Sequence, residues 1–330
     1  MVISRPSSER QYFKPLSMST GYIAALATLC CWTVSTFVFA KLSRQEDSYV
    51  LNKAALFFSI FLSGILVCAV DRLAPWQLFT LPAYSNWYWL GLSGILGKSV
   101  GDYCGFQALR ILGARRRSMV STLGPGFTWF FGFIILSEQM NWLGFLGMLL
   151  TILSLLLLLN SSFEKVAVKK ENFGLPLPGL LFGTASAGLT GLAFILSKKT
   201  IIESGESISA FHATWIRILV AFIALAIVDM VRNRHTGFIN KFLWDKEKAM
   251  LLFWGILFGA VLGLSFSLVA ITKINAAAAY TIFSLVPVSV MLVNVIAYKK
   301  RITALSWLYS FMAVAGAIVI LWRDSILRYV

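Results

Sequence analysis

The sequence has few charged residues, and this scarcity excludes most classes of soluble protein. Only 13% of its 330 residues are Asp, Glu, Lys or Arg, whereas soluble domains carry about 25%. Hydrophobic residues make up 58% of the chain, and its mean hydropathy is +0.78. One or two soluble cores could not bury this much apolar surface, so the sequence predicts an all-α integral membrane protein.

Histidine, cysteine and acidic residues are also scarce, and each shortage argues against a kind of site. The chain has two histidines, and its four cysteines all lie in apolar runs, so we expect no metal site, no disulfide and no cofactor. The G-x-x-x-x-G-K-[ST] motif of ATP-binding loops does not occur. The apolar segments hold no histidine cluster, paired acidic motif or serine nucleophile signature, so we do not expect an enzyme. With only 14 acidic residues, proton coupling has little support.

The net charge of +15 comes from 29 basic residues, and their positions show what they serve. They fall in short clusters between apolar runs, as residues that flank membrane segments do. A nucleic-acid-binding protein would gather them on one polar face. We therefore expect a lipid bilayer, and no nucleic acid, as the partner of this chain.

Ten apolar segments are each long enough to cross a bilayer, which takes about 20 residues. They cover residues 21–40, 51–70, 87–109, 117–137, 142–160, 176–197, 210–230, 250–271, 276–298 and 303–322. The first segment is too long for the apolar part of a cleavable signal and has no small-residue cleavage site after it, so we expect it to be retained.

The two halves of the chain repeat one another. At an offset of 162 residues the scarcer residue types coincide: Pro125 with Pro287, Gly97 with Gly259, Gly101 with Gly263, and Gly105 with Ser267. A slightly different offset lays Thr33 on Thr190 and Lys41 on Lys198. We therefore predict a first five-helix repeat with a short polar tail (1–160), a linker (161–175) and a second five-helix repeat (176–330). An odd number of helices per repeat inverts the second repeat relative to the first.

Two stretches carry a resemblance to a known family. GARRRSMVSTLGPGFTWFFGFIILSEQ (113–139) and NAAAAYTIFSLVPVSVMLVNVIAYKKR (275–301) each show a small-residue entry, a mid-helix proline and a charged exit. The chain, from Gly21 to Arg323, resembles the ten-helix EamA-type members of the drug/metabolite transporter superfamily. Glu138 stands at the acidic exit position of that family, and Lys300 departs from it. The resemblance implies a transporter, and we expect a multi-pass protein of the bacterial inner (cell) membrane.

Lys98 and Asp102 are the most informative charged residues. They lie about 11 and 15 residues into the third segment, well inside the hydrocarbon, and their spacing of four puts them on one helix face. Ionisable residues at this depth are costly and often functional. The pair either lines a central cavity, where Lys98 attracts a carboxylate or phosphate, or merely fixes the third helix. The equivalent residues of the second repeat, Ala260 and Leu264, are uncharged, so the polar chemistry is expected to be concentrated in the third helix.

Other candidates leave two interpretations open. Arg217 either lines the cavity or extends to the interface, and Lys53 is expected to be interfacial. The arginines 115–117 are expected to be a topological anchor, with an anion-attracting vestibule as the alternative. Ser121 could supply a neutral hydrogen bond. By resemblance, the candidates for the cavity wall, with ordinary helix packing as the alternative, are Trp32, Thr33, Tyr103, Thr190, Phe194, Ser265 and Tyr280.

Prolines and small residues shape the helices themselves. Pro125 and Pro287 are expected to kink their helices and to border the solute path. Two ridges of small residues every four positions let helices approach closely: Gly97, Gly101 and Gly105 in the third segment, and Gly259, Gly263 and Ser267 in the eighth. These ridges serve either static packing or sliding between helices.

The sequence therefore predicts a secondary transporter that moves a small polar or anionic metabolite, such as an amino acid or a sugar phosphate, by alternating access. The alternatives are a solute channel and a membrane-embedded enzyme. We expect a monomer or homodimer. The orientation stays open, because the distribution of Lys and Arg places both termini outside, whereas the resemblance implies cytoplasmic termini.

Overall fold

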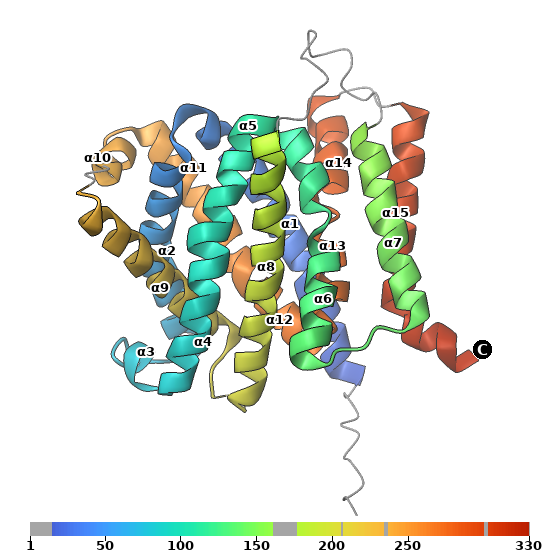
Figure 1. Ribbon diagram of the computed structural model, residues 1–330, viewed down its shortest axis with the longest axis horizontal. Coiled ribbons are helices and arrows are strands. Elements are labelled where there is room, and N and C mark those ends of the chain that lie inside the picture. The colour runs from blue at the N-terminus through green and yellow to red at the C-terminus, as the bar shows by residue number, and fades with distance from the viewer. Residues whose placement is uncertain (1–14, 161–176, 206, 234–236, 300–302, 330) are drawn as a thin grey trace, which may run out of the picture.

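Helices make up nearly all of the chain in the computed structural model, which describes residues 15–160, 177–205, 207–233, 237–299 and 303–329 (Figure 1). These ranges contain no strand, so the all-α prediction is confirmed for them. The predicted linker 161–175 lies outside the described residues. In Figure 1 the lower end of the bundle is where α1 begins and α8 ends, and the upper end is where α1 ends and α8 begins.

The elements follow one another in two series. The first is α1 (Pro15–Gln45), α2 (Ser48–Val70), α3 (Gln77–Thr80), α4 (Tyr84–Gly94), the π-helical turn η1 (Ile95–Gly101), α5 (Asp102–Ser121), α6 (Gly124–Leu136) and α7 (Trp142–Asn160). The second is α8 (Leu177–Glu203), α9 (Ala210–Val231), α10 (Phe238–Leu243), α11 (Lys246–Ile256), the π-helical turn η3 (Leu257–Gly263), α12 (Leu264–Lys273), α13 (Ala276–Phe283), α14 (Val286–Tyr298) and α15 (Ala304–Tyr329).

Seven helical stretches are long and apolar enough to cross a membrane. They are residues 19–45, 48–70, 177–203, 210–231, 246–273, 276–296 and 304–322. Two shorter apolar helices cover residues 124–136 and 142–158. The predicted third segment, 87–109, is not among them, and it is the stretch that carries Lys98 and Asp102. This set of helices makes the chain a multi-pass integral membrane protein.

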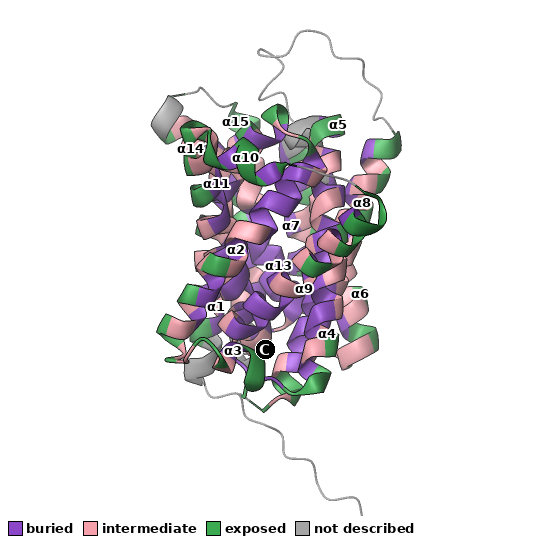
Figure 2. Cartoon of the chain, turned by 90° about the vertical axis from the view of Figure 1, so that its left-hand side faces the viewer, coloured by how far each residue is buried: buried purple, intermediate pink, exposed green. Residues whose placement is uncertain are grey.

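The outer surface of the bundle is apolar. Large hydrophobic side chains are exposed around it, including Ile65 (68%), Phe311 (65%) and Ile296 (77%). Buried residues gather between the helices, and exposed ones lie on the outside and at both ends (Figure 2). Apolar surface this extensive is suited to contact with lipid rather than water.

The internal repeat is visible in the backbone. The turns η1 and η3 occupy equivalent positions at the predicted offset, and so do α6 and α14. Each of these two helices ends before a residue in the left-handed conformation, Ser137 (φ 52°) and Lys299 (φ 50°). Equivalent helices run in opposite directions, since α7 ascends in Figure 1 whereas α15 descends.

The last helices of the two repeats, α7 and α15, pack against each other through equivalent residues. The Thr151 hydroxyl donates to the carbonyl oxygen of Ala313, which lies 162 positions further on, at 3.2 Å. Close by, at positions that are not equivalent, a Cβ added to Gly147 or to Gly316 would lie 2.7 Å from the carbonyl oxygen of the other. A contact between equivalent residues lies on the axis that relates two copies, so the repeats are related by an approximate two-fold axis.

Two helix boundaries differ from the prediction. The fourth segment was expected to begin at residue 117, but α5 continues to Ser121 and the interruption falls at 122–123, before Pro125. The ninth segment, expected as one helix over 276–298, is interrupted at 284–285, before Pro287. Proline has no N–H and clashes with the preceding turn, so it ends the helix before it and sits in the first turn of the next.

Candidate functional site

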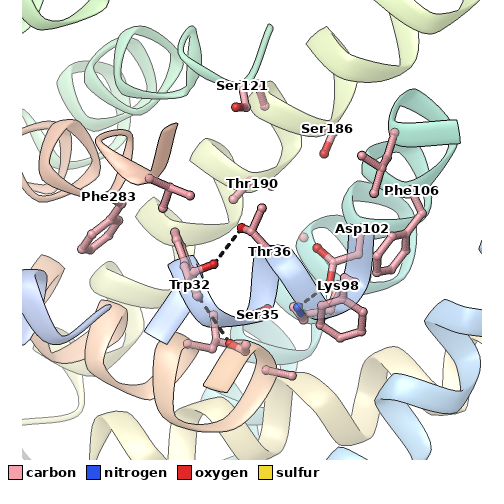
Figure 3. A pocket seen from close by; sticks show the side chains of 18 of the residues that line it. Trp32, Ser35, Thr36, Lys98, Asp102, Phe106, Ser121, Ser186, Thr190 and Phe283 are labelled. Carbon is pink, nitrogen blue, oxygen red and sulfur yellow. Dashed lines mark hydrogen bonds and ion pairs between the residues drawn. The ribbon is translucent and has the colours of Figure 1, made fainter. Parts of the chain in front are cut away.

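A cavity of about 270 Å³ lies between the two repeats. Its wall comes from α1, α2, η1 and α5 of the first repeat and from α8, α9, η3, α12, α13 and α14 of the second (Figure 3). The sequence-predicted residues that line it are Trp32, Lys98, Asp102, Ser121, Thr190, Phe194, Arg217, Tyr280, Gly97, Gly259 and Pro287. The fold thus brings together residues that are up to 255 positions apart in the chain.

Several other candidates lie outside this wall. The Thr33 hydroxyl donates to the Leu29 carbonyl oxygen of its own helix at 2.7 Å. The Tyr103 hydroxyl accepts a hydrogen bond from Gln107 Nε2 at 2.9 Å, and its ring packs on Tyr49. Ser265, Pro125, Gly101, Gly105, Gly263 and Ser267 are also absent from the cavity wall, and the glycines have a packing role described below.

The Lys98–Asp102 ion pair lies at the junction of η1 and α5 and faces the cavity (Figure 3). The side chain of Lys98 is 15% exposed and that of Asp102 is 34% exposed. Asn52 Nδ2 donates to the Lys98 and Ser99 carbonyl oxygens at 3.1 and 3.0 Å, which holds this turn against α2. The wider π-helical turn therefore has its polar backbone satisfied while Lys98 points into the cavity.

Both π-helical turns require glycine at their last position. A Cβ on Gly101 would lie 2.9 Å from the Leu96 carbonyl oxygen, and one on Gly263 would lie 2.5 Å from that of Phe258. These oxygens are backbone atoms of the same turns, so they cannot move aside without rebuilding the turn. This requirement explains the paired glycines that the sequence shows at the two equivalent positions.

The small-residue ridges pack across the two repeats. In the first repeat, Gly97 and Gly101 lie against Ala193 and Thr190 of α8. In the second repeat, Gly259 and Gly263 lie against Ser35 and Trp32 of α1. Each ridge thus contacts the first helix of the other repeat, with Trp32 rather than Thr33 in the position of Thr190. The ridges are the surfaces along which the repeats meet.

Arg217 of α9 is 1% exposed and lines the cavity, so it does not extend to the interface. Its guanidinium carbon lies 5.8 Å from the centre of the Phe194 ring, a cation–π contact. Its Nε and Nη1 have no hydrogen-bond partner among the described residues. The equivalent residue of the first repeat, Ala55, also lines the cavity. Arg217 is the most deeply buried cation of the site.

Arg117 is a cavity residue that the sequence analysis treated as a topological anchor. A Cβ on Gly105 would lie 2.9 Å from both Arg117 Nη2 and Ser186 Oγ, so the absence of a side chain at Gly105 makes room for this guanidinium. The side chains of residues 115 and 116 lie outside the described part of the chain. A run of three arginines does not show which one turns inward, so no sequence signal singled out Arg117.

Aromatic rings line the part of the cavity nearest the lower end. Trp32, Phe194, Tyr280 and Phe283 contact one another, with ring centroids 5.3 to 6.4 Å apart. The residues that precede them in α13, 276–279, are buried and do not line the cavity. These four rings, from α1, α8 and α13, are called the aromatic floor below.

A polar network closes the lower end beneath the aromatic floor. Lys198 of α8 pairs with Glu138 and donates to the Ile274 carbonyl oxygen at 2.7 Å. Glu138 in turn accepts from the backbone N–H of Ala276, at the start of α13, at 3.2 Å. A carboxylate is favourable at a helix N-terminus. Glu138, the acidic exit residue of the first repeat, therefore ties that repeat to the second.

Lys53, expected near the membrane interface, has its side chain buried between helices rather than exposed on the outside of the bundle. It pairs with Asp229 of α9, and the two side chains are 10% and 7% exposed. The Tyr49 hydroxyl also donates to Asp229 Oδ1 at 2.6 Å. A buried lysine is tolerated because a carboxylate meets it. The partner is 176 residues away, a pairing that the sequence does not show.

The fold and the cavity define a multi-pass helical membrane protein with two repeats around a polar centre. The model of the EamA-like transporter family matches residues 19–160 and 177–322, one match for each repeat. The chain belongs to the EamA-like transporter family, and so to the transporters of the drug/metabolite type rather than to an enzyme family.

Comparisons with individual proteins give evidence about the fold of the chain and none about its substrate. No curated protein matches the chain. One crystal structure, described only as that of a protein, superimposes with a TM-score of 0.65 over 92% of this chain and 97% of that chain, at 16% identity. At this identity the similarity shows a shared fold and does not extend to a substrate.

Proposed function

We propose that the chain is a secondary transporter that moves a small polar or anionic metabolite by alternating access. The observation that carries this proposal is the cavity between the repeats, which is polar at its centre and closed below by the aromatic floor and the Glu138–Lys198 network. Its upper wall includes Ala40 and Leu109, which also line a surface depression at the upper end with Arg110. These shared residues support a solute path toward the upper end, which is what one state of a carrier would have.

The proposal includes ten membrane-spanning segments, in two inverted sets of five. Residues 246–273, 276–296 and 304–322 of the second repeat are long and apolar enough to span. Their equivalents in the first repeat are less apolar or shorter. Several boundaries coincide at the offset of 162, such as the starts of α4 and α11 and of α7 and α15, but α5 is continuous where the second repeat has the two helices α12 and α13. The start of α1 and the end of α15 both lie at the lower end, as an even number of crossings requires (Figure 1). We place the protein in the bacterial inner membrane.

The approximate two-fold axis supports alternation between two states. In the present state the lower closure is buried, with Lys198 and Glu138 side chains 7% and 18% exposed. At the upper end Lys41 of α1 pairs with Glu247 of α11 across the repeats, and both side chains are at least half exposed. If each repeat adopted the conformation that the other has now, the lower end would open and the upper end would close.

Counterflow in proteoliposomes tests this function. A screen of metabolite classes by thermal stabilisation first identifies a ligand, because binding to the native state raises the unfolding temperature. Vesicles loaded with this solute should then take up labelled solute saturably and faster than empty vesicles. Flux that rises linearly without saturation would indicate a channel, and chemical conversion of the solute would indicate an enzyme.

The Lys98–Asp102 pair has its own test within this assay. Lys98→Ala and Asp102→Asn are each expected to reduce the saturable uptake, because each removes one charge from the cavity wall. If both variants transport at the wild-type rate, the pair only fixes η1 against α5 and has no part in the solute path.

A further inference from the structure

The charges that line the cavity do not balance. Three cations face it, Lys98, Arg117 and Arg217, and Asp102 is the one carboxylate among its lining residues. Asp102 forms its ion pair with Lys98. The wall therefore carries a net charge of about +2, in surroundings where water is scarce and charges interact strongly.

Arg217 shows that this excess charge lacks a counter-ion among the residues that the structure describes. It is 1% exposed, it has no salt bridge to a described residue, and two of its nitrogens have no hydrogen-bond partner there. Burial of a charge without a partner is costly, and buried polar groups almost always have one. An anion that enters the cavity from outside can supply the negative charge and the hydrogen-bond acceptors that Arg217 lacks.

The two arginines lie at opposite ends of one helical ridge. Arg117 Nη2 lies at Gly105, and Arg217 Nη2 lies 3.2 Å from the position of a Cβ on Gly97. These glycines are eight positions apart, or about 12 Å along a helix. The neutralised Lys98–Asp102 pair lies between them. If each guanidinium bound one oxyanion, the two oxyanions would be several ångströms apart. A short carbon chain spans this distance.

We propose that the solute is a small organic dianion with one oxyanion at each end, received by Arg217 near the aromatic floor and by Arg117 near Ser186. This inference rests on the proposed transport function and names the class of solute for the same cavity. Arginine holds carboxylate and phosphate oxygens in the same way, through paired N–H donors. A dicarboxylate and a phosphorylated acid share this chemistry, and a cavity of about 270 Å³ limits either to a small molecule.

The first experiment compares matched ligands on the purified wild-type protein by thermal unfolding. The first arm contains compounds with an oxyanion at each end: the dianions succinate and glutarate, and 3-phosphoglycerate, whose phosphate adds a further negative charge. The control arm contains butyrate, with one charge, 1,4-butanediol, with none, and 1,4-diaminobutane, with two positive charges. We expect the dianions to raise the unfolding temperature in a saturable way, butyrate to raise it less, and the diol and diamine not at all. The rank of carboxylates against the phosphate compound then tells the two sources of the oxyanion apart.

The second experiment assigns the binding to the two arginines. Arg217→Gln and Arg117→Gln should each weaken dianion binding by about tenfold to a hundredfold, as loss of a charged hydrogen bond does. Arg217→Lys keeps the positive charge, so this variant should retain part of the affinity for the dianion. Arg232→Gln removes an exposed arginine from the end of the same helix and should leave binding unchanged.

The outcomes separate this inference from the transport function. Saturable counterflow of a neutral or cationic solute without any response to dianions would overturn the dianion class and leave the transporter intact. Dianion binding that depends on Arg217 but gives no counterflow would support the site and overturn the carrier. If Arg217→Gln does not fold, the ligand comparison on the wild-type protein and the Arg217→Lys affinity still decide the question.

Discussion

The two repeats share a backbone but differ in charge. Their π-helical turns and proline-interrupted helices coincide at one offset. However, where a charged cavity residue has an equivalent in the other repeat that also lines the cavity, that equivalent residue is apolar. Lys98 and Asp102 correspond to Ala260 and Leu264, and Arg217 corresponds to Ala55. Symmetry of the backbone allows two equivalent conformations. Asymmetry of the side chains avoids repulsion between identical charges that would otherwise face each other across the cavity.

The comparison also corrects an expectation. From the sequence, the polar chemistry was expected in the third helix, because the residues equivalent to Lys98 and Asp102 are apolar. The structure adds Arg217 of α9, in the second repeat, to the same cavity. The repeats therefore divide the charges between them rather than leaving one repeat as an inert wall.

The largest effect on the free energy of unfolding is expected at an ion pair whose two equivalent positions in the other repeats carry apolar residues. Lys53 and Asp229 are equivalent to Trp215 and Val67, which are both buried in an apolar core. Asp229→Leu alone should lower the free energy of unfolding by about 3–5 kcal/mol, since it leaves Lys53 buried without a partner. The double variant Lys53→Met with Asp229→Leu should recover most of that loss. Chemical unfolding in detergent measures both, and equal losses for the single and double variants would contradict the explanation.

A second prediction tests the symmetry of the π-helical turns. Gly263→Ala should cost about 1–3 kcal/mol, because the added Cβ meets the Phe258 carbonyl oxygen and the Trp32 ring, each at 2.5 Å. Gly101→Ala should cost less, since its nearest atom lies at 2.9 Å. Gly126→Ala is the control, because nothing lies within 4 Å of its added Cβ. Thermal unfolding should rank the three variants in this order, and a neutral Gly263→Ala would show that the turn does not require glycine.

A third prediction compares the two closures. Glu138→Gln should destabilise the present state by about 1–3 kcal/mol, because it weakens a partly buried pair and the cap of α13. Glu247→Gln removes the exposed partner of Lys41 and should cost less than about 1 kcal/mol. Labelling of a cysteine introduced at the lower end should rise in the Glu138 variant only. Equal effects of the two substitutions would remove the distinction between a closed and an open end.

The smallest effect is expected at the hydrogen bonds that hold η1. Asn52→Ala should cost about 1 kcal/mol, because the Lys98 and Ser99 carbonyl oxygens each lose a donor. The equivalent Thr214 donates to Ala210 of its own helix, so Thr214→Ala should leave η3 in place. Saturable uptake should fall in the Asn52 variant, where Lys98 is less firmly held, and stay unchanged in the other.

Much of the fold could be predicted from the sequence because the evidence for it is local. Apolar runs of about 20 residues predict membrane helices, and the coincidence of Pro125 with Pro287 and of Gly101 with Gly263 predicts two copies of one unit. The same prolines also indicated interruptions, although α5 extends past the expected boundary. Buried pairs such as Lys53–Asp229 were missed, because each partner looks like an ordinary residue near a helix end.

The sequence by itself determined the class of this protein, its repeat and its most conspicuous charged pair, because composition, spacing and offset can be read along the chain. Only the tertiary structure decided which side chains share the cavity. In a membrane helix the lipid-facing and buried sides are both apolar, so periodicity does not set the rotation of the helix. One residue corresponds to about 100° of that rotation. For this reason Thr33 and Tyr103 turn away from the cavity while Arg117 and Arg217 turn into it.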